Sequence, residues 1–506
     1  MPHPETPSKR AVRFRSIALV PVFALIALLC WAFASPIGSS PDDDYHLTSI
    51  WCGLGDRAGL CESVPGHPDE RVVPFAAGQT NCDRHFAGST ETCPIDGLAP
   101  DSPIVTSRGN FVSTYPPVYY AFMGLFASTH YTVAALVMRI VNIILFVGLS
   151  SLLYFLLAPS RRRTLLWTWS IVIVPLGAFL VASNNPSAWA VISGGILWLA
   201  LVGYFEQRGW RSIVLGGVAA VSLIMGAGAR ADSAIYAVVA VGVAVFMTVE
   251  KSRLYLLKAI APLVFVIIAI AFYLTANQSS VAAGGLSGEH AASGAGGPTL
   301  IWNNLLQLPG LWAGVLGTWG LGWLDTLMPA SVYVLGILAF GAATFTGLVS
   351  VTVRKVIALA GVGALLVAIP SWILYKGHAT VGQEVQPRYI MPLVIIFAGV
   401  ALLQAGPRLI RFTRVQTIVV VIAVSIANAV ALHTTMHRYI TGLGMDGLNL
   451  NHNVYWWWHI PVSPTIVWVI GSLAFAAAVA LGLWQSSARL IPVDDADAGQ
   501  RSPVAA

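Results

Sequence analysis

The acidic run Pro41–His46 holds the residues of this chain whose types and spacing most strongly suggest chemistry. Its carboxylates, Asp42, Asp43 and Asp44, repel one another, so their proximity is unfavourable unless a cation or a proton transfer uses them. A carboxylate can accept the proton of an attacking hydroxyl group, and its hard oxygens also suit Mg or Mn. A solvated turn is the alternative, because Pro-Asp-Asp is common turn chemistry. The candidate catalytic residues are these three and His46, and the three carboxylates are also the candidate metal ligands.

Basic residues at the ends of expected helices form a second candidate group. Arg388 begins one helix, Arg230 separates two others, and Lys376 follows a fourth. The planar fork of Arg matches phosphate oxygens, and Lys supplies a point charge at the depth of a lipid phosphate. Snorkelling to lipid headgroups is the alternative, and a salt bridge to Asp232 explains Arg230 equally well. These three residues are the candidate ligands of a lipid phosphate.

Asp325 is the third candidate, and it follows a stretch rich in tryptophan. A charge beside a membrane is energetically expensive, so an ionisable group there is a functional candidate by default. Capping of a helix N-terminus beside Pro329 is an equally good explanation. We therefore expect Asp325 either to line the same cavity as the acidic run or to begin a helix.

Long apolar segments must position these residues. Of the 506 residues, 56% are hydrophobic and only 10% are charged, against about 25% charged in a soluble domain. A bilayer suits such a chain if each segment closes its own backbone hydrogen bonds as a helix. We expect an all-α bundle of about twelve spanning helices, with two short aromatic-rich stretches, 116–128 and 309–323, that are interfacial or re-entrant. The expected spans are 17–34, 131–158, 164–182, 187–204, 212–227, 234–249, 256–275, 329–350, 356–374, 389–406, 416–434 and 463–484.

The distribution of basic residues predicts the orientation of this bundle. With both termini in the cytoplasm, 19 of the 28 Lys and Arg residues face the cytoplasm, 8 face the exterior and Arg139 lies within a helix. The net charge of +6 thus follows topology, and nucleic acid is not an expected partner. The expected organisation is a cytoplasmic segment 1–16, a transmembrane domain 17–484 with exoplasmic loops 36–115 and 276–328, and a disordered cytoplasmic tail 485–506.

Cysteine placement agrees with this orientation. Four of the five cysteines, Cys52, Cys61, Cys82 and Cys93, lie in the first exoplasmic loop. An even number confined to an oxidising compartment predicts disulfides, and the spacings do not match the usual zinc knuckles. Because short loops close most easily, we expect the pairs Cys52–Cys61 and Cys82–Cys93.

Three motifs give the chain a resemblance to an uncharacterised family of predicted bacterial membrane proteins. The first, Pro-Asp-Asp/Glu-x-x-His, is Pro41–His46 here, and the second, Gly-x-Leu-Asp, is Gly322–Asp325 followed by Pro329. The third, Gln-x-Arg-Tyr-x-x-Pro, is Gln386–Pro392. The chain departs from the family at Pro387, where Gly is expected before the Arg. The resemblance covers nearly the whole chain.

The helix number, the topology, the long first loop and the acidic motif are also similar to those of type C (GT-C) membrane glycosyltransferases. That group includes the protein O-mannosyltransferases and the lipid A aminoarabinose transferase. Its members place an essential acidic residue or pair in the first exoplasmic loop and use polyprenyl-phosphate sugars as donors. The resemblance implies a GT-C-like fold whose site contains the acidic run, with Gln386 and Tyr389 lining the cavity beside Arg388.

These features together predict a glycosyltransferase at the exoplasmic face of the plasma membrane. The donor would be a polyprenyl-phosphate sugar, and the acceptor a cell-surface glycan or lipid. Asp43 or Asp44 would act as the base, and Arg388 would bind the leaving phosphate about one sugar ring away, roughly 6–10 Å. A lipid or glycan flippase and a non-catalytic assembly partner of envelope biosynthesis are the alternatives. No Gly-rich loop of the ATP or NAD type occurs, so neither ATP nor NAD is an expected cofactor. The candidate cofactor is a divalent cation, Mg or Mn, bound by the acidic run.

The predicted topology can be tested by cysteine labelling. Cysteines introduced at 161–163 or 411–414 should react with an impermeant reagent only from the cytoplasm, and those near 70 or 290 only from outside. The asymmetry of basic residues is the physical reason. Labelling of intact cells and inverted vesicles measures it, and reversed accessibility of either set would contradict the twelve-helix topology.

Overall fold

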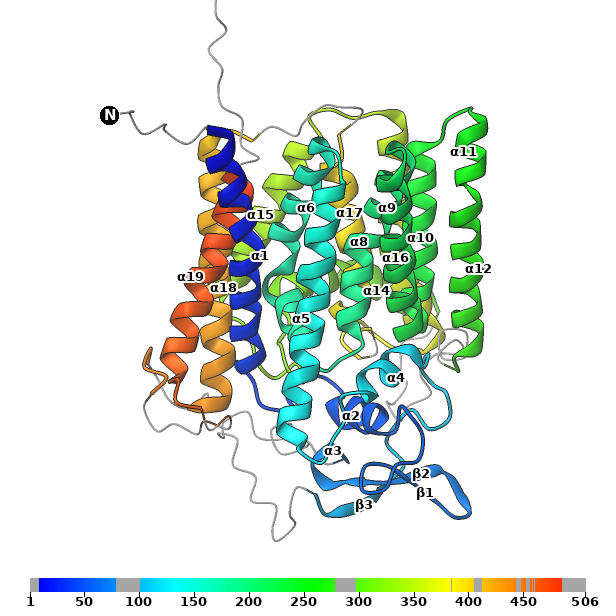
Figure 1. The fold of residues 1–506 in the computed structure, drawn as a ribbon, viewed down its shortest axis with the longest axis vertical. Coiled ribbons are helices and arrows are strands. Elements are labelled where there is room, and N and C mark those ends of the chain that lie inside the picture. Colours follow the sequence, from blue (N-terminus) through cyan, green and yellow to red (C-terminus); the bar gives the residue numbers. More distant parts are fainter. Residues whose placement is uncertain are drawn as a thin grey trace, which may run out of the picture.

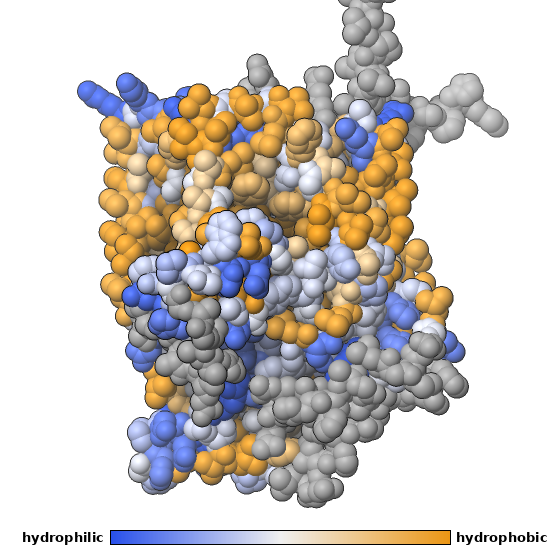
Figure 2. Space-filling model, turned by 180° about the vertical axis from the view of Figure 1, so that it is seen from behind, coloured by the Kyte–Doolittle hydropathy of each residue, from blue (hydrophilic) through white to orange (hydrophobic). Residues whose placement is uncertain are grey.

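The computed structural model describes residues 9–78, 101–277, 297–383, 385–404, 412–442, 447–451, 456, 458 and 460–484. Long helices run side by side as one bundle (Figure 1). Short helices and strands lie at one end, which we call the loop end, and the helix α1 begins at the opposite end. Apolar residues form a broad belt on the outside of the bundle, whereas polar residues gather toward the loop end (Figure 2).

The bundle confirms the predicted helical membrane fold. Ten helices in the described ranges are long and apolar enough to cross a membrane, and Ile17–Phe33 and Pro387–Leu402 are shorter apolar helices. Each expected span coincides with one of these. The bundle helices are α1 Lys9–Phe33, α5 Tyr131–Leu156, α6 Pro159–Val172, α7 Ala178–Val181, α8 Ser187–Glu206, α9 Trp210–Ala229, α10 Ala231–Thr248, α11 Arg253–Lys258, α12 Ile260–Thr275, α14 Pro298–Ala313, α15 Ala330–Gly347, α16 Val353–Lys376, α17 Pro387–Leu402, α18 Arg414–Ile440 and α19 Pro464–Trp484.

Two π-helical turns interrupt the bundle helices. The turn η1, Ile173–Gly177, joins α6 to α7, and η2, Gly314–Thr318, follows α14. The stretch 309–323, expected to be interfacial or re-entrant, therefore forms the end of α14 together with η2 and the turn that follows. The predicted Cys82–Cys93 pair, residues 278–296 of the second loop and the tail 485–506 lie outside the described residues.

The helices α8 and α17 form the centre of the bundle, because both are apolar around their whole circumference and are buried along most of their length. A Cβ atom at Gly194 would lie 2.9 Å from the Cα atom of Pro392, so only glycine permits this approach of the two main chains. Pro387 occupies the first turn of α17, where its missing N–H has no helical partner to lose. Arg388 is thereby placed at the buried start of α17.

The loop end contains the helices α2 Asp43–Trp51, α3 Phe75–Gly78 and α4 Val118–Gly124. A three-stranded antiparallel sheet of β1 Glu62–Val64, β2 His67–Pro74 and β3 Pro103–Thr106 has the order β1-β2-β3. The expected all-α description lacks this sheet, because β2 begins with several charged and exposed residues and has no clear local alternation.

A disulfide joins Cys52 to Cys61, as expected, and so ties the end of α2 to the strand that follows. The loop that it closes lies at the loop end of the bundle, beside α4, with which α2 packs. The fifth cysteine, Cys30, is buried in α1 and is free.

Arg139 fixes the connection between α1 and α2. Its guanidinium group, fully buried within α5, donates hydrogen bonds to the carbonyl oxygens of Ala32 (2.8 Å), Ser35 (2.7 Å) and Pro36 (2.7 Å). The carbonyl groups at the end of a helix have no intrahelical partner, and a cation there satisfies them. The only basic residue expected within a span therefore holds the segment that leads into the acidic run.

Replacement of Arg139 should destabilise the fold. Arg139→Leu leaves three buried carbonyl groups without this donor, at about 1–3 kcal/mol for each unsatisfied group. Arg162→Leu is the control, because Arg162 also donates to carbonyl groups but is partly exposed to solvent. Thermal unfolding in detergent should show a large decrease of the unfolding temperature for Arg139→Leu and a small decrease for Arg162→Leu. Equal decreases would contradict the role of Arg139 in satisfying the three carbonyl groups.

Candidate functional site

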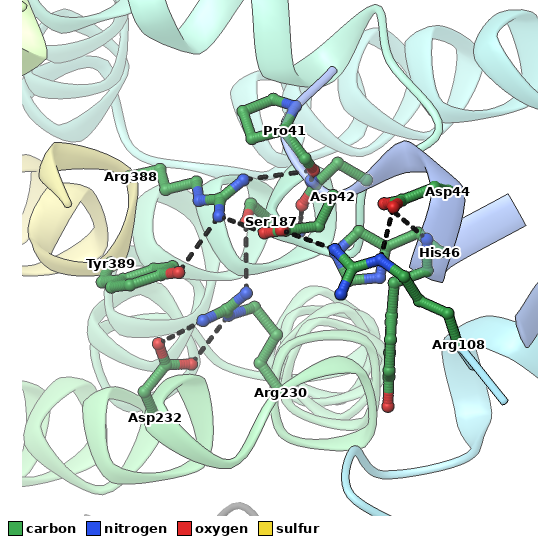
Figure 3. A network of polar contacts seen from close by, with 12 residues as sticks. Pro41, Asp42, Asp44, His46, Arg108, Ser187, Arg230, Asp232, Arg388 and Tyr389 are labelled. Atoms are coloured by element: carbon green, nitrogen blue, oxygen red, sulfur yellow. Dashed lines mark hydrogen bonds and ion pairs between the residues drawn. The ribbon is translucent and has the colours of Figure 1, made fainter. Parts of the chain in front are cut away.

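Residues from four separate segments meet at the loop end in a cluster of charged side chains (Figure 3). We call it the Arg–Asp cluster. Its cations come from a loop, from the α9–α10 junction and from the start of α17, and its anions come from the segment before α2 and the first turns of α2 and α10. The members are Arg108, Arg230, Arg388, Asp42, Asp44 and Asp232.

The central contact joins Asp42 to Arg388, which are 346 positions apart in the sequence. The Arg388 Nη2 atom donates to Asp42 Oδ2 at 2.6 Å and to the Tyr389 hydroxyl at 3.0 Å, while Nη1 donates to the Pro41 carbonyl at 3.2 Å. Only 3% of the Arg388 side chain is exposed, against 35% for Asp42. The expected gap of 6–10 Å concerned Asp43 or Asp44, the predicted bases, and stays a prediction. Asp42 instead meets Arg388 directly, because opposite charges in a buried site attract strongly.

Asp42 is held in an unusual backbone conformation. It precedes α2 with φ 58° and ψ 27°, a left-handed conformation that costs most non-glycine residues about 1–2 kcal/mol. The preceding carbonyl of Pro41 accepts hydrogen bonds from Arg388 and from Asn185 Nδ2 (2.8 Å). Burial acts to raise the pKa of Asp42, but the charge and hydrogen bond of Arg388, together with the charge of Arg108, outweigh it and lower the pKa to about 2. Asp42 is therefore a carboxylate at neutral pH.

Arg230 provides a second buried guanidinium group. It forms a two-pronged pair with Asp232 (2.9 and 2.8 Å), and its Nη1 atom donates to Ser187 Oγ at 3.5 Å. The guanidinium carbons of Arg230 and Arg388 lie 4.7 and 5.0 Å from the centre of the Tyr389 ring. Two buried cations thus share one aromatic ring, and such a pair attracts anions.

Arg108 completes the cluster from the solvent side. Its Nε atom donates to Asp44 Oδ2, and its Nη2 atom donates to Asp42 Oδ1 at 3.4 Å. The Arg108 side chain is 45% exposed. The two carboxylate oxygens of Asp42 therefore have different partners, the buried Arg388 and the exposed Arg108. No sequence pattern pointed to Arg108, because it lies in an irregular loop outside the three motifs.

Asp43 points away from the cluster into the protein. Its fully buried Oδ2 atom accepts hydrogen bonds from the backbone N–H groups of Gly38 and Ser40, both at 3.1 Å. Burial raises the pKa of Asp43 to about 7, against the opposing influence of Arg139 and the two backbone donors. This geometry suits a residue that closes the turn between α1 and α2.

The three consecutive carboxylates do not converge on one point. Asp42 faces Arg388, Asp43 faces the backbone of its own turn, and Asp44 accepts from Arg108 and from the N–H group of Tyr45 (2.9 Å). Within the described ranges, no group of three or more His, Cys, Asp and Glu side chains is arranged to hold a metal ion. The residues of the acidic run therefore do not fit a shared Mg or Mn site.

His46 lies behind the acidic run in an aromatic setting. Its Nδ1 atom is 2.9 Å from the Tyr120 hydroxyl, and its ring packs against Tyr45 and Tyr115. Burial is the main cause that lowers the pKa of His46 to about 3. His46 is thus a neutral imidazole. Through its contact with Tyr120, a residue of α4, it positions α2 against α4.

Comparison with known proteins places the chain in a family. Residues 25–397 match the family of predicted membrane proteins DUF2142. The chain belongs to this family. The matched region contains Asp42, Arg108, Arg230 and Arg388, so the whole Arg–Asp cluster lies within the family domain. A comparison with curated proteins finds no match.

Asp325 lies near the family's acidic run but belongs to a second ion pair. Arg438 donates to Asp325 Oδ2 through Nε (3.2 Å) and Nη2 (3.0 Å), and the Arg438 side chain is fully buried. The neighbouring Trp323 donates through Nε1 to the carbonyl of Gly38 at 2.9 Å. This pair thus stands beside the turn that Asp43 closes, separate from the contacts of Arg388.

The other two candidates differ in their relation to the cluster. Gln386 precedes α17 and lines a crevice of about 10 Å³ together with Pro41, Arg388 and the turn 320–324. Lys376 ends α16 on the exposed surface, and its ammonium group lies 4.9 Å from the ring of Trp372. The structure therefore brings Gln386 to the cluster and leaves Lys376 outside it.

The raised pKa of Asp43 predicts a pH-dependent effect of Asp43→Asn. A carboxyl group with a raised folded pKa stabilises the fold fully below its unfolded pKa near 3.9, and this contribution is lost as pH rises through about 7. Between pH 4 and 7, the free energy of unfolding of the Asn variant should therefore rise relative to that of the wild-type protein, by ~4 kcal/mol at most.

Unfolding of both proteins in detergent at pH 4.5 and pH 8 measures this gain. Asp42→Asn is the control with the opposite sign, because a lowered folded pKa stabilises the fold above the unfolded pKa and Asn loses that contribution at both pH values. If the difference in stability between the wild-type protein and Asp43→Asn is the same at both pH values, the raised pKa of Asp43 is contradicted.

Proposed function

We propose that this protein is a glycosyltransferase that moves a sugar from a polyprenyl-phosphate donor to a cell-surface glycan or lipid acceptor. The observation that carries the proposal is the pair of buried guanidinium groups, Arg230 and Arg388, beside the partly exposed carboxylate of Asp42. The cluster lies at one end of an apolar helix bundle, where a lipid phosphate resides while its tail stays in the bilayer.

The two buried arginines suit the phosphate of the donor. During transfer, the bond between the anomeric carbon and the phosphate oxygen breaks, and negative charge grows on the departing phosphate. Fixed cations in a site with little water stabilise such charge strongly and need no rearrangement during the reaction. Arg388 and Arg230 have this character, because the Tyr389 ring lies against both, the Pro41 carbonyl holds Arg388 and the Asp232 carboxylate holds Arg230.

Asp42 is the best-placed base of the acidic run. Its carboxylate is partly open to solvent, whereas Asp43 and Asp44 are buried and directed to other partners. In the proposed step, an acceptor hydroxyl oxygen attacks the anomeric carbon, its proton passes to Asp42, and the lipid phosphate leaves with the bonding electron pair. A single displacement of this kind inverts the anomeric centre. Asp44, bound to Arg108, positions that arginine.

The arrangement supports chemistry on the exoplasmic side of the plasma membrane. The Cys52–Cys61 disulfide lies at the same end of the bundle as the Arg–Asp cluster, and disulfides persist in oxidising compartments. The opposite end carries the loops that are rich in Lys and Arg, which favours the cytoplasm for that end and for both termini.

Binding of farnesyl phosphate, a short polyprenyl phosphate, tests the donor site. The purified protein in detergent should bind farnesyl phosphate more tightly than farnesol, and Arg388→Gln or Arg230→Gln should weaken this binding about 10- to 100-fold. That range corresponds to the loss of one hydrogen-bonded charge, about 1.5–3 kcal/mol. Isothermal titration calorimetry measures the affinities.

Arg161→Gln is the matched control for these variants. Arg161 is a buried arginine paired with Glu206 (2.6 Å) at the other end of α8, away from the cluster. Its replacement should leave farnesyl phosphate binding unchanged in protein that remains folded. Equal affinities of the wild-type protein for farnesyl phosphate and farnesol would contradict the proposed function.

A further inference from the structure

Arg388 has one charged partner, and that partner is replaceable. Among the described residues, its hydrogen-bonding partners are the Pro41 carbonyl, the Tyr389 hydroxyl and the Asp42 carboxylate. The first two belong to the wall of the site. The Asp42 side chain is about a third exposed while Arg388 is almost completely buried, so the carboxylate separates the guanidinium group from solvent.

The Nη2 atom of Arg388 carries two N–H groups, and they donate to Asp42 and to Tyr389, so an anion that binds Nη2 must replace one of these partners. The crevice that Arg388 lines together with Pro41, Gln386 and the turn 320–324 has a volume of about 10 Å³. That is room for about one water molecule and is too small for a phosphate group. A phosphate that reaches the Nη2 atom of Arg388 must therefore take the position of the Asp42 carboxylate.

Asp42 has a second partner that can hold it after such a displacement. Arg108 lies on the solvent side of the carboxylate and already contacts Oδ1, at the longer distance of 3.4 Å. The Arg108 side chain is partly exposed, so its Nη2 atom has room to follow a small movement of Asp42 while the Nε atom stays bound to Asp44. The left-handed backbone at Asp42 is held in part by the contacts of Arg388 with Pro41 and Asp42, so loss of the Asp42 contact favours movement.

We propose that Asp42 occupies the phosphate position on Arg388 until a polyprenyl phosphate displaces it, so that the donor binds before the base is released. The inference rests on the proposed function and adds an order of events to it. While Asp42 is bound by Arg388 and Arg108, both of its oxygens are occupied by guanidinium groups and it is a weak base. Displacement from Arg388 frees one oxygen beside the newly bound donor, where the acceptor hydroxyl must lie.

The lowered pKa of Asp42 agrees with this order. The Arg388 charge is the strongest influence that opposes burial and keeps the pKa near 2, and its hydrogen bond acts in the same direction. Removal of that contact and arrival of a second anion both raise the pKa, and a base with a higher pKa accepts a proton more readily. Donor binding therefore strengthens the base that the next step needs.

The affinity of Asp42→Asn for farnesyl phosphate tests the inference. If the carboxylate competes with phosphate for Arg388, the neutral and equally sized Asn should raise the affinity about tenfold. Glu206→Gln is the matched control. Glu206 ends α8, far from the cluster, and its carboxylate pairs with the buried Arg161, so its loss should leave the affinity for farnesyl phosphate unchanged. An unchanged or lower affinity of Asp42→Asn would overturn the inference and leave the proposed function standing, provided that the wild-type protein still prefers farnesyl phosphate to farnesol.

Two further measurements complete the test. Inorganic phosphate should bind far more weakly than farnesyl phosphate, and equal affinities would overturn the assignment to a lipid-linked ligand. If Asp42→Asn does not fold, the wild-type protein still decides. Its infrared difference spectrum on addition of farnesyl phosphate should show a carboxylate band that shifts as a guanidinium partner is lost, and the absence of any carboxylate change would overturn the displacement.

Discussion

The ion pair between Asp42 and Arg388 joins the beginning of the chain to its last third, and the arrangement of the helices between them determines whether it forms. A charge buried without a partner is strongly unfavourable, so a packing of the bundle that separates the two residues would leave Arg388 uncompensated. The pair therefore constrains the fold as well as the chemistry. Its partial exposure on the Asp42 side leaves the contact open to exchange, which a fully enclosed pair would not permit.

Several independent contacts hold the two partners of this ion pair. Arg139 and Asp43 both act on the segment before Asp42, the first through the carbonyl groups at the end of α1 and the second through the N–H groups of the next turn. On the other side, α17 is enclosed by neighbouring helices, so Arg388 cannot move outward with its helix. The acidic run thus contains two residues that support the site from behind, Asp43 and His46, and two that belong to the cluster, Asp42 and Asp44.

The sequence predicted the helices well because a spanning helix must be apolar along its whole length, and that condition is visible in every segment. It also predicted, from their motifs and their common side of the membrane, that the acidic run and Arg388 would share one site, but it did not predict a direct ion pair. It could not decide which carboxylate would face Arg388, because a single left-handed residue, Asp42, sets the direction of all three. Arg108 and the small sheet depend on contacts between distant parts of an irregular loop, which have no local pattern.

The close approach of α8 and α17 at Gly194 has a consequence for ligand size. Ser187, which contacts Arg230, begins α8, and Arg388 is the second residue of α17. Both cations are thus positioned by helices whose main chains approach closely at Gly194 and Pro392. The separation of the two guanidinium groups therefore depends on the spacing of these helices and on the contacts with Asp232, the Pro41 carbonyl and the Tyr389 ring that hold the side chains. A ligand that bridges both cations must place its anionic oxygens at that separation. The protein can therefore discriminate among ligand headgroups by the spacing of their anionic oxygens, without contacting the rest of the ligand.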